Sequence, residues 1–230
     1  MKYKNISQGI FLERLHRFGA LVEIDGVVEY VHVKNTGRCR ELFIPGVKVY
    51  LEKSDNPERK TKYSLISVYK KEMLVNIDSQ VPNQVVHEAL LNGKISGFDD
   101  VCCLKREVTY GNSRFDIYYE TESGSRGYIE VKGVTLDVSG TAMFPDAPTL
   151  RGKKHLIELA DAKKAGFEAH VLFMIQYKPA NVFTPNRVMD QAFADALTFA
   201  ADSGVSIHAY DSVVTEDEIT LGDSVQVRMV

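Results

Sequence analysis

The sequence has few cysteines, and their arrangement excludes a disulfide-stapled fold. There are three among 230 residues, and two of them, Cys102 and Cys103, are adjacent. An odd number with an adjacent pair does not give the even, spaced framework of a disulfide-rich secreted domain. No group of cysteines and histidines has the spacing of a zinc site either. These shortages favour a globular protein of a reducing compartment, stabilised by its apolar core.

Long apolar runs and targeting signals are also missing. No run approaches the roughly 18 apolar residues of a membrane-spanning helix, and residues 1–5 are not followed by the apolar stretch of a signal peptide. The chain has no internal repeat, no low-complexity tract and no glycine-rich phosphate loop. We therefore expect a cytoplasmic protein without a membrane partner. Its oligomeric state stays open, with a homodimer among the alternatives.

Charge is distributed unevenly along the chain, whose formal net charge is −3. Residues 1–81 hold 14 Lys+Arg against 10 Asp+Glu, a balance of +4, whereas residues 82–230 hold 14 against 21, a balance of −7. A basic part joined to an acidic part is typical of a polyanion-binding module beside a carboxylate-rich site. An excess of this size also lies within ordinary variation.

The first 80 residues predict short strands separated by turns. Turn signals recur at residues 35–37, 45–46 and 55–57. Five or so strands in such a length indicate a small barrel such as an OB-fold, although a Greek-key or SH3-like barrel has much the same pattern. The expected strands cover residues 10–15, 20–24, 27–33, 47–51, 63–69 and 73–77.

The remainder predicts an α/β domain with a mixed sheet. Pro82 is expected to begin a helix of about ten residues that ends at Asn92 and Gly93. Thr149 is a candidate N-cap for a helix over 150–164, and a third helix is expected over 189–201. The near-continuous apolar run at 169–176 predicts a buried central strand. Further strands are expected over 101–110, 115–119, 128–131 and 205–210.

Three charged residues of two neighbouring strands form the main candidate site. Asp116 lies in the first strand, and Glu130 and Lys132 lie in the second. Residues i and i+2 of a strand share a face, so Glu130 and Lys132 should lie on the same side. Two carboxylates can hold Mg²⁺ or Mn²⁺, which metal-assisted phosphodiester cleavage requires, and the lysine would orient the attacking water or neutralise the phosphate. Such spacing alone also arises by chance on exposed strands.

Two further acids could join this site. Glu88 lies at the border of the apolar face of the first helix, from where it could bind the metal directly or through water. Glu107 is a second possibility on the strand over 101–110.

Two groups of basic and polar residues are candidates for nucleic-acid contacts. One opens the helix over 150–164, whose N-terminal amides also favour anions. The other surrounds a turn of the expected barrel, where a basic groove with aromatic platforms would hold single strands. An ordinary solvated surface would carry similar residues. The candidates are His32, Asn35, Thr36, Arg38, Arg59, Lys60, Arg151, Lys153 and Lys154.

Seven blocks distributed over nearly the whole chain resemble the sugar fermentation stimulation protein family. The blocks cover residues 11–18, 35–38, 59–63, 113–116, 130–136, 144–149 and 151–156. This resemblance implies DNA binding, with RNA as an alternative partner, and a link to the regulation of sugar metabolism. It further implies an OB-like barrel over residues 1–81 and a PD-(D/E)xK nuclease-like domain over 82–230.

Carried over from that resemblance, Asp116, Glu130 and Lys132 occupy the three positions of the nuclease signature, and Glu88 corresponds to the helix acid that often precedes it. Phe115 stands where many such signatures have proline. The expected function is therefore a metal-dependent nuclease that binds DNA. The alternative is a DNA-binding regulator that keeps the nuclease fold without cleaving. A small-molecule-binding protein lacks any supporting cofactor loop.

Overall fold

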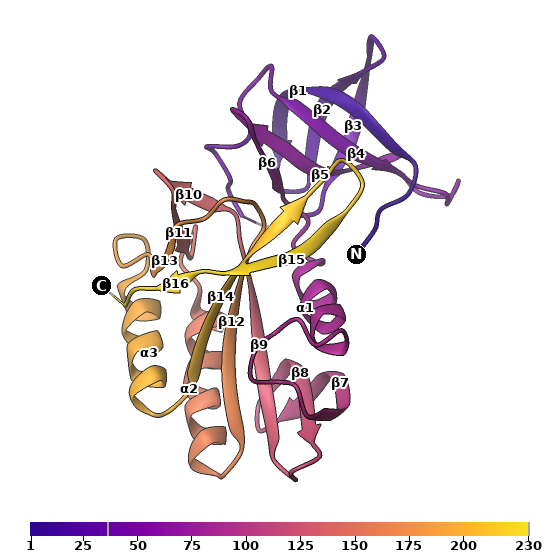
Figure 1. Cartoon of the computed structure of the whole chain (residues 1–230). Coiled ribbons are helices and arrows are strands. Elements are labelled where there is room, and N and C mark those ends of the chain that lie inside the picture. The colour runs from indigo at the N-terminus through magenta and orange to yellow at the C-terminus, as the bar shows by residue number, and fades with distance from the viewer. Residues whose placement is uncertain (36, 230) are drawn as a thin grey trace.

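The computed structural model describes residues 1–35 and 37–229. A β-barrel formed by the first part of the chain lies against one end of an α/β domain (Figure 1). The barrel strands are β1 (Ile6–His16), β2 (Gly19–Ile24), β3 (Val27–Val33), β4 (Lys48–Lys53), β5 (Tyr63–Lys70) and β6 (Met73–Asn76). The helices are α1 (Pro82–Leu91), α2 (Leu150–Lys164) and α3 (Gln191–Asp202). The other strands are β7 (Val101–Tyr110), β8 (Ser113–Thr121), β9 (Arg126–Val134), β10 (Leu136–Val138), β11 (Thr141–Phe144), β12 (Glu168–Ile175), β13 (Val182–Pro185), β14 (Ser206–Val214), β15 (Ile219–Ser224) and β16 (Gln226–Val227).

The barrel closes through pairing of β3 with β5. Antiparallel pairs join β1 to β2 and β4, β2 to β3, and β4 to β5, and the short parallel pairing of His32 with Ser64 and of Val33 with Leu65 completes the ring. This order confirms the OB-like alternative among the expected barrels. Along β2 the side chains of Ala20, Val22 and Ile24 point inward and are buried, as the period of two predicts.

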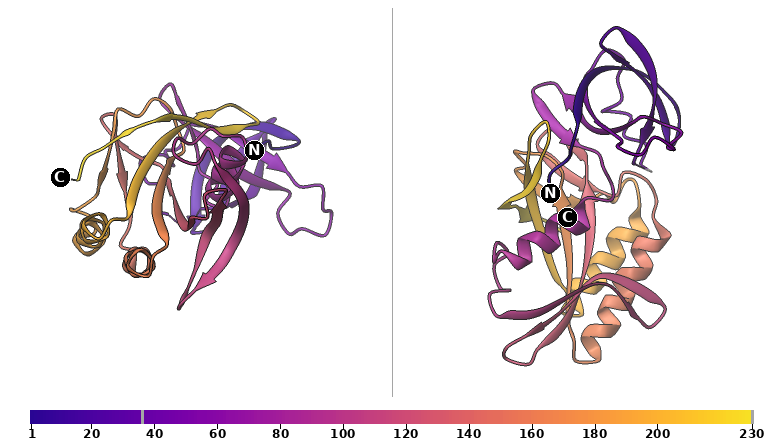
Figure 2. Two further views of the ribbon diagram at one scale, coloured as in Figure 1. Left: turned by 60° about the horizontal axis from the view of Figure 1, so that its bottom comes forward. Right: turned by 90° about the vertical axis from the view of Figure 1, so that its right-hand side faces the viewer.

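The α/β domain is built on a six-stranded mixed sheet in the order β15-β14-β12-β9-β8-β7. The three central strands β9, β12 and β14 are parallel, and β7, β8 and β15 run antiparallel to their neighbours. Helix α1 covers one face, and α2 and α3 cover the other (Figure 2). Strand β12 is buried from Val171 to Ile175, which explains its apolar run. The expected α/β class with a mixed sheet is confirmed.

Helix boundaries follow the capping residues. The Thr149 side chain accepts a hydrogen bond from the Gly152 amide at 3.0 Å, and the Asp190 side chain accepts one from the Phe193 amide at 3.0 Å. Helix α3 therefore starts after Asp190, two residues later than expected. The sequence did not predict β15, which pairs with β14, or the small sheet β10-β11-β13-β16, whose strands are two to four residues long. Among the described residues, no helix combines the length and the apolar character needed to cross a lipid bilayer.

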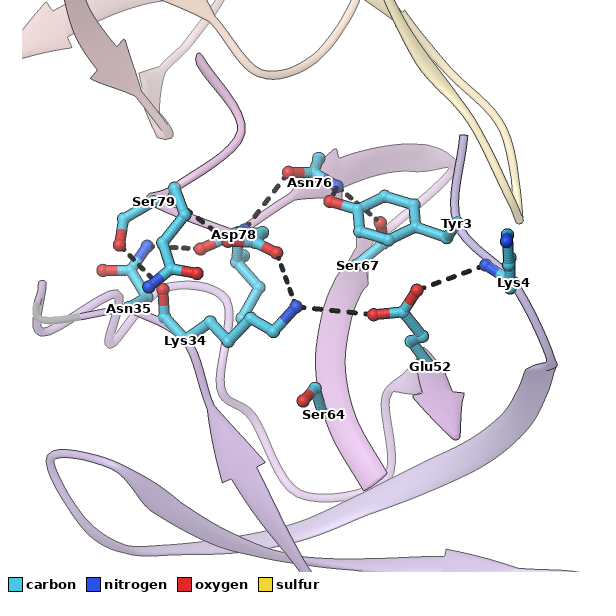
Figure 3. Close-up of polar contacts among 12 residues, drawn as sticks. Tyr3, Lys4, Lys34, Asn35, Glu52, Ser64, Ser67, Asn76, Asp78 and Ser79 are labelled. Carbon is cyan, nitrogen blue, oxygen red and sulfur yellow. Dashed lines mark hydrogen bonds and ion pairs between the residues drawn. The ribbon is translucent and has the colours of Figure 1, made fainter. Parts of the chain in front are cut away.

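A polar network around Lys34, Asn76 and Asp78 (Figure 3) also joins the barrel to the α/β domain. The Lys34 ammonium contacts the Asp78 carboxylate at 3.1 Å and that of Glu52 at 3.4 Å. Asp78 and Asn76 are both buried, and the Gln176 side-chain amide donates to Asn76 Oδ1 at 2.9 Å and to the Asp78 carbonyl at 3.1 Å. Because Gln176 directly follows β12, this network fixes the barrel against the end of the central sheet.

The same network reaches the strand that carries the candidate site. A Cβ added to Gly133 would lie 2.5 Å from Gln176 Oε1 and 2.8 Å from Pro82 Cγ. Only glycine permits this close approach. The segment after Lys132 is thus held between the first residue of α1 and the end of β12.

Candidate active site

The candidate acids lie where β8 and β9 separate. Pairing of the two strands runs from Ile117 opposite Ile129 to Glu120 opposite Arg126 and stops before Asp116 and Glu130. In addition, Phe115 packs in the part of the core that contains α2, whereas Ile117 packs in the part that contains α1. The regular alternation of β8 is therefore broken at Asp116. At this break, backbone groups that would pair in a continuous β8–β9 sheet are free to form other hydrogen bonds.

Asp116 accepts hydrogen bonds on both carboxylate oxygens. The Val131 backbone amide donates to Oδ2 at 2.8 Å, and the Asn83 side chain, in the first turn of α1, donates to Oδ1 at 2.6 Å. Burial and then the negative charge of Glu130 raise the pKa of Asp116 to about 6, against the opposing effect of these hydrogen bonds and of Lys132. The two carboxylates are therefore close enough to repel each other, an arrangement that a cation would relieve.

Glu130 is almost completely buried, with 2% of its surface exposed. Its Oε1 accepts hydrogen bonds from Lys132 Nζ and from His155 Nδ1. Burial raises the pKa of this carboxyl group, but the charge of Lys132 and the bond from His155 outweigh it, so the pKa of Glu130 lies below the ordinary value. Its second oxygen, Oε2, is buried and has no hydrogen-bond partner among the described residues.

His155, which was not among the predicted site residues, supports Glu130 from α2. Its ring is buried, and Arg151 Nε donates to its Nε2 at 3.4 Å. Because Nε2 accepts this bond, the ring proton lies on Nδ1, which donates to Glu130. The only sequence feature that could have identified His155 is its place on the buried face of the helix that follows the strand of Glu130. Because Glu130 and His155 are 25 positions apart in the sequence, no short motif links them.

The structure does not bring Glu88 to the other acids. Its carboxylate accepts from the Met1 amino group at 2.8 Å and from the Gln84 side chain at 2.9 Å. Glu88 lies five residues after Asn83, which places the two side chains about 140° apart around the helix. Asn83 therefore occupies the position near Asp116 that was expected for Glu88. Glu107 is exposed and pairs with Arg114 at 3.5 Å.

The basic residues at the start of α2 lie beside the buried pair of Glu130 and His155. Arg151, Lys153 and Lys154 are exposed, and Lys154 Nζ donates to the Asn112 carbonyl at 2.8 Å. Arg151 and Lys154 line a cavity of about 350 Å³ together with His155. An open space next to the site is therefore available for the phosphate that this helix start was predicted to bind.

The predicted contacts on the barrel divide into internal and exposed residues. Asn35 is buried. Its side-chain Nδ2 donates to the Ile77 carbonyl at 2.8 Å, and its side-chain Oδ1 accepts a hydrogen bond from the Gly37 backbone amide at 2.6 Å. Arg59 donates to Ser64 at 2.7 Å, and His32 is half-buried. Arg38 and Lys60 are exposed. Thr36 lies outside the described residues.

The donor set fits a divalent cation. Mg²⁺ is usually bound by one or two carboxylates and keeps several waters. Asp116 and Glu130 supply two, and one oxygen of Glu130 is buried without a partner among the described residues. Among the described residues, no group of three or more His, Cys, Asp and Glu side chains has metal-binding geometry. A cation at this site would be bound by the two acids and by solvent.

Comparisons with known proteins agree with the two-part fold. The model of the sugar fermentation stimulation protein RE domain matches residues 80–218, and that of the SfsA N-terminal OB domain matches residues 12–77. Sugar fermentation stimulation protein homologs from Alkaliphilus oremlandii and Desulfitobacterium hafniense are each 55% identical to the chain over 231 residues. The alignments cover 99% of this chain and 98% of the former protein, and 100% and 99% for the latter. The structure of Pyrococcus furiosus SfsA in complex with Ca²⁺ superposes with a TM-score of 0.90 at 28% identity, covering 99% of this chain and 98% of that one.

Proposed function

The chain belongs to the sugar fermentation stimulation protein family, and on that premise we propose that it is a divalent-metal-dependent nuclease that hydrolyses phosphodiester bonds of DNA or RNA. The observation that carries this proposal is the buried Oε2 of Glu130, which has no described partner, in a residue whose neighbour Val131 donates its amide to Asp116. A buried carboxylate oxygen without a partner is costly unless a cation or an ordered water binds it.

Each side chain of the site has a separate task in this reaction. Asp116 and Glu130 would hold Mg²⁺ or Mn²⁺; the Pyrococcus furiosus relative was solved with Ca²⁺, a cation of the same hard class. When bound, such a cation polarises the phosphoryl oxygen and lowers the pKa of water. Lys132 holds a positive charge beside Glu130, where it orients the attacking water or stabilises the developing phosphorane charge. Asn83 and His155 fix the orientation of the two carboxylates.

Cleavage of labelled oligonucleotides with and without Mn²⁺ tests the proposal. We expect cleavage that EDTA abolishes and that Asp116→Asn reduces at least 100-fold, because the amide can keep the bonds from Asn83 or Val131 but cannot bind the cation as a carboxylate does. Asp202→Asn is a matched control, since this aspartate is exposed and is the last residue of α3. Cleavage that survives in Asp116→Asn would show that the activity belongs to another site or to a contaminant.

A regulator that binds nucleic acid without cleaving is the second candidate. It is favoured by the hydrogen bonds that already occupy both oxygens of Asp116 and Oε1 of Glu130. The same assay separates the candidates. No metal-dependent cleavage of single- or double-stranded DNA or RNA, with binding retained, would favour the regulator.

A further inference from the structure

Three cavities follow one another along residues 144–151, from the end of β11 to the first turn of α2. The first, of about 570 Å³, lies between the barrel and Ala147–Pro148. The second, of about 300 Å³, shares Arg17, Gly37 and the same two loop residues with it and extends to Thr149 and Gly133. The third, of about 350 Å³, begins at Leu150 and is lined by His155. Because consecutive residues of this segment line them, the cavities are arranged in order from the barrel to His155, the partner of Glu130.

The first cavity is strongly cationic. Four arginines and one histidine line it, and none of the described residues lining it is acidic. The Arg14 guanidinium donates to the carbonyls of Asn35, Gly37 and Arg38 at 2.7–3.0 Å, so it holds the loop that carries the other charges. Arg38 and Arg40 are exposed, and neither is in an ion pair with another described residue. Their guanidinium groups are available for phosphate oxygens, which they match in geometry.

Aromatic rings continue this cavity over the barrel surface. Phe18 and Tyr30 are 45% and 43% exposed. The Phe18 ring stacks on His32, with centroids 6.4 Å apart and planes 20° apart, and the Arg17 guanidinium carbon lies 5.8 Å from the Phe18 centroid. A hydrogen bond of 2.9 Å joins Tyr30 to His16, which lines the cavity. The aromatic platform and the arginine cavity therefore form one surface.

Unpaired bases fit this surface better than a duplex does. In a duplex the faces of the bases are covered by their neighbours, so side-chain rings can stack only on unstacked or single-stranded nucleotides. Arginines alone would suit either form, because both carry phosphates. The exposed rings beside the arginines are the feature that favours single strands over a duplex.

We propose that the barrel binds single-stranded nucleic acid, with bases stacked on Phe18 and Tyr30 and phosphates bound by Arg38 and Arg40. The strand then follows residues 144–151 toward Asp116 and Glu130. This inference rests on the proposed nuclease function only for its second part, the delivery of the strand. Binding of nucleic acid at the barrel does not depend on the proposed nuclease function.

Fluorescence anisotropy with the full chain in EDTA tests binding without cleavage. The probes are one labelled 15-nucleotide sequence as single-stranded DNA, as single-stranded RNA and as duplex DNA, and comparison of the two single strands identifies the natural source. Phe18→Ala should weaken single-strand binding about fivefold or more, the effect of losing one stacked base, and leave duplex binding unchanged. Arg38→Ala with Arg40→Ala should lower the slope of log affinity against log salt by roughly one to two.

Phe199→Ala is the matched control for the platform. Phe199 is 46% exposed on α3 and has a lysine ammonium 5.2 Å from its ring centroid, so it reproduces the exposure and the neighbouring charge of Phe18 in another region. Tyr30→Ala is a second variant, in case Phe18→Ala disturbs folding. Equal losses for Phe18→Ala and Phe199→Ala, or duplex binding as tight as single-strand binding, would overturn the inference. Cleavage dependent on Asp116 would remain unaffected by that result, so the two proposals fail separately.

Discussion

The two regions of the molecule hold their charged groups in opposite ways. In the α/β domain, Glu130 is buried and its Oε1 is bonded to Lys132 and His155. On the barrel, Arg38 and Lys60 are exposed and form no ion pair with another described residue. Buried interactions are directional and costly to break, whereas exposed charges are screened by salt and act nearly additively. Under the two proposals, this difference separates the site where the chemistry would occur from the surface that would attract a polyanion.

Lys34 is an exception on the barrel, because its charge is largely buried and paired, as the charges of the α/β site are. Its side chain is 18% exposed and that of Asp78 is 2% exposed. We expect Lys34→Met to lower the free energy of unfolding by about 3–5 kcal/mol, since it leaves the Asp78 carboxylate buried without its cation. Urea unfolding measures this effect.

The double variant Lys34→Met with Asp78→Asn controls for the size of the lysine side chain. It removes both charges and keeps an acceptor for the Gln80 amide, which bonds Asp78 Oδ1 at 3.0 Å. It should recover a large part of the lost stability. A loss below about 1 kcal/mol in the single variant would place Lys34 with the exposed barrel charges.

His155 tests the other side of the comparison. We expect His155→Ala to destabilise the protein by about 2–3 kcal/mol, because Glu130 then loses one donor of a charge-assisted hydrogen bond in a buried setting. Chemical denaturation gives the value. In a Glu130→Gln background the same substitution should cost less, since the neutral amide needs less stabilisation. Equal losses in both backgrounds would assign the effect to packing of the ring alone.

Much of the fold followed from local sequence features. Thr149, Pro82 and the apolar run before Gln176 marked element ends and a buried strand, and the structure has α1 and α2 at the expected residues. These features depend on neighbours in the chain, so the sequence displays them. The family resemblance added the identity of the barrel, which strand count alone left among three alternatives.

The site was predictable only in part. Asp116, Glu130 and Lys132 were recognisable because two of them share a strand face and the third lies in the adjacent strand. Asn83 and His155 reach the acids only after α1 and α2 pack on opposite faces of the sheet. Glu88 was expected there from its place at the border of the apolar face of α1. The rotation of α1 about its axis determines whether Glu88 or Asn83 faces Asp116, and in the structure it is Asn83. No local pattern carries that information.

A pair of histidines in the α/β domain extends the comparison to pH. His170 Nδ1 and His208 Nε2 are 3.1 Å apart, and His170 Nε2 bonds Tyr119 at 2.9 Å. Burial and the neighbouring His208 lower the pKa of His170 to about 3. The unfolded chain binds a proton at a pKa of about 6.5, so stability is lost as pH falls below that value.

Between pH 6.5 and pH 5, we expect His170 to contribute a loss of about 2 kcal/mol in unfolding free energy. Urea unfolding at several pH values measures the slope. His170→Gln, which does not titrate, should flatten it. An unchanged slope in this variant would show that His170 is accessible to protons in the folded state, as the exposed barrel groups are.

The smallest effect on stability is expected at Lys60, in the loop between β4 and β5. Because its side chain is exposed without an ion pair to another described residue, Lys60→Ala should change the free energy of unfolding by less than about 0.5 kcal/mol. If this loop contacts the polyanion, the variant should also weaken binding for all sequences alike and reduce the salt slope by roughly one. Anisotropy titrations at several salt concentrations give both quantities. Lys71→Ala, in the turn between β5 and β6, is the control for general charge. Equal salt slopes in the two variants would mean that the barrel attracts nucleic acid through its total charge, without a defined surface at the loop of Lys60.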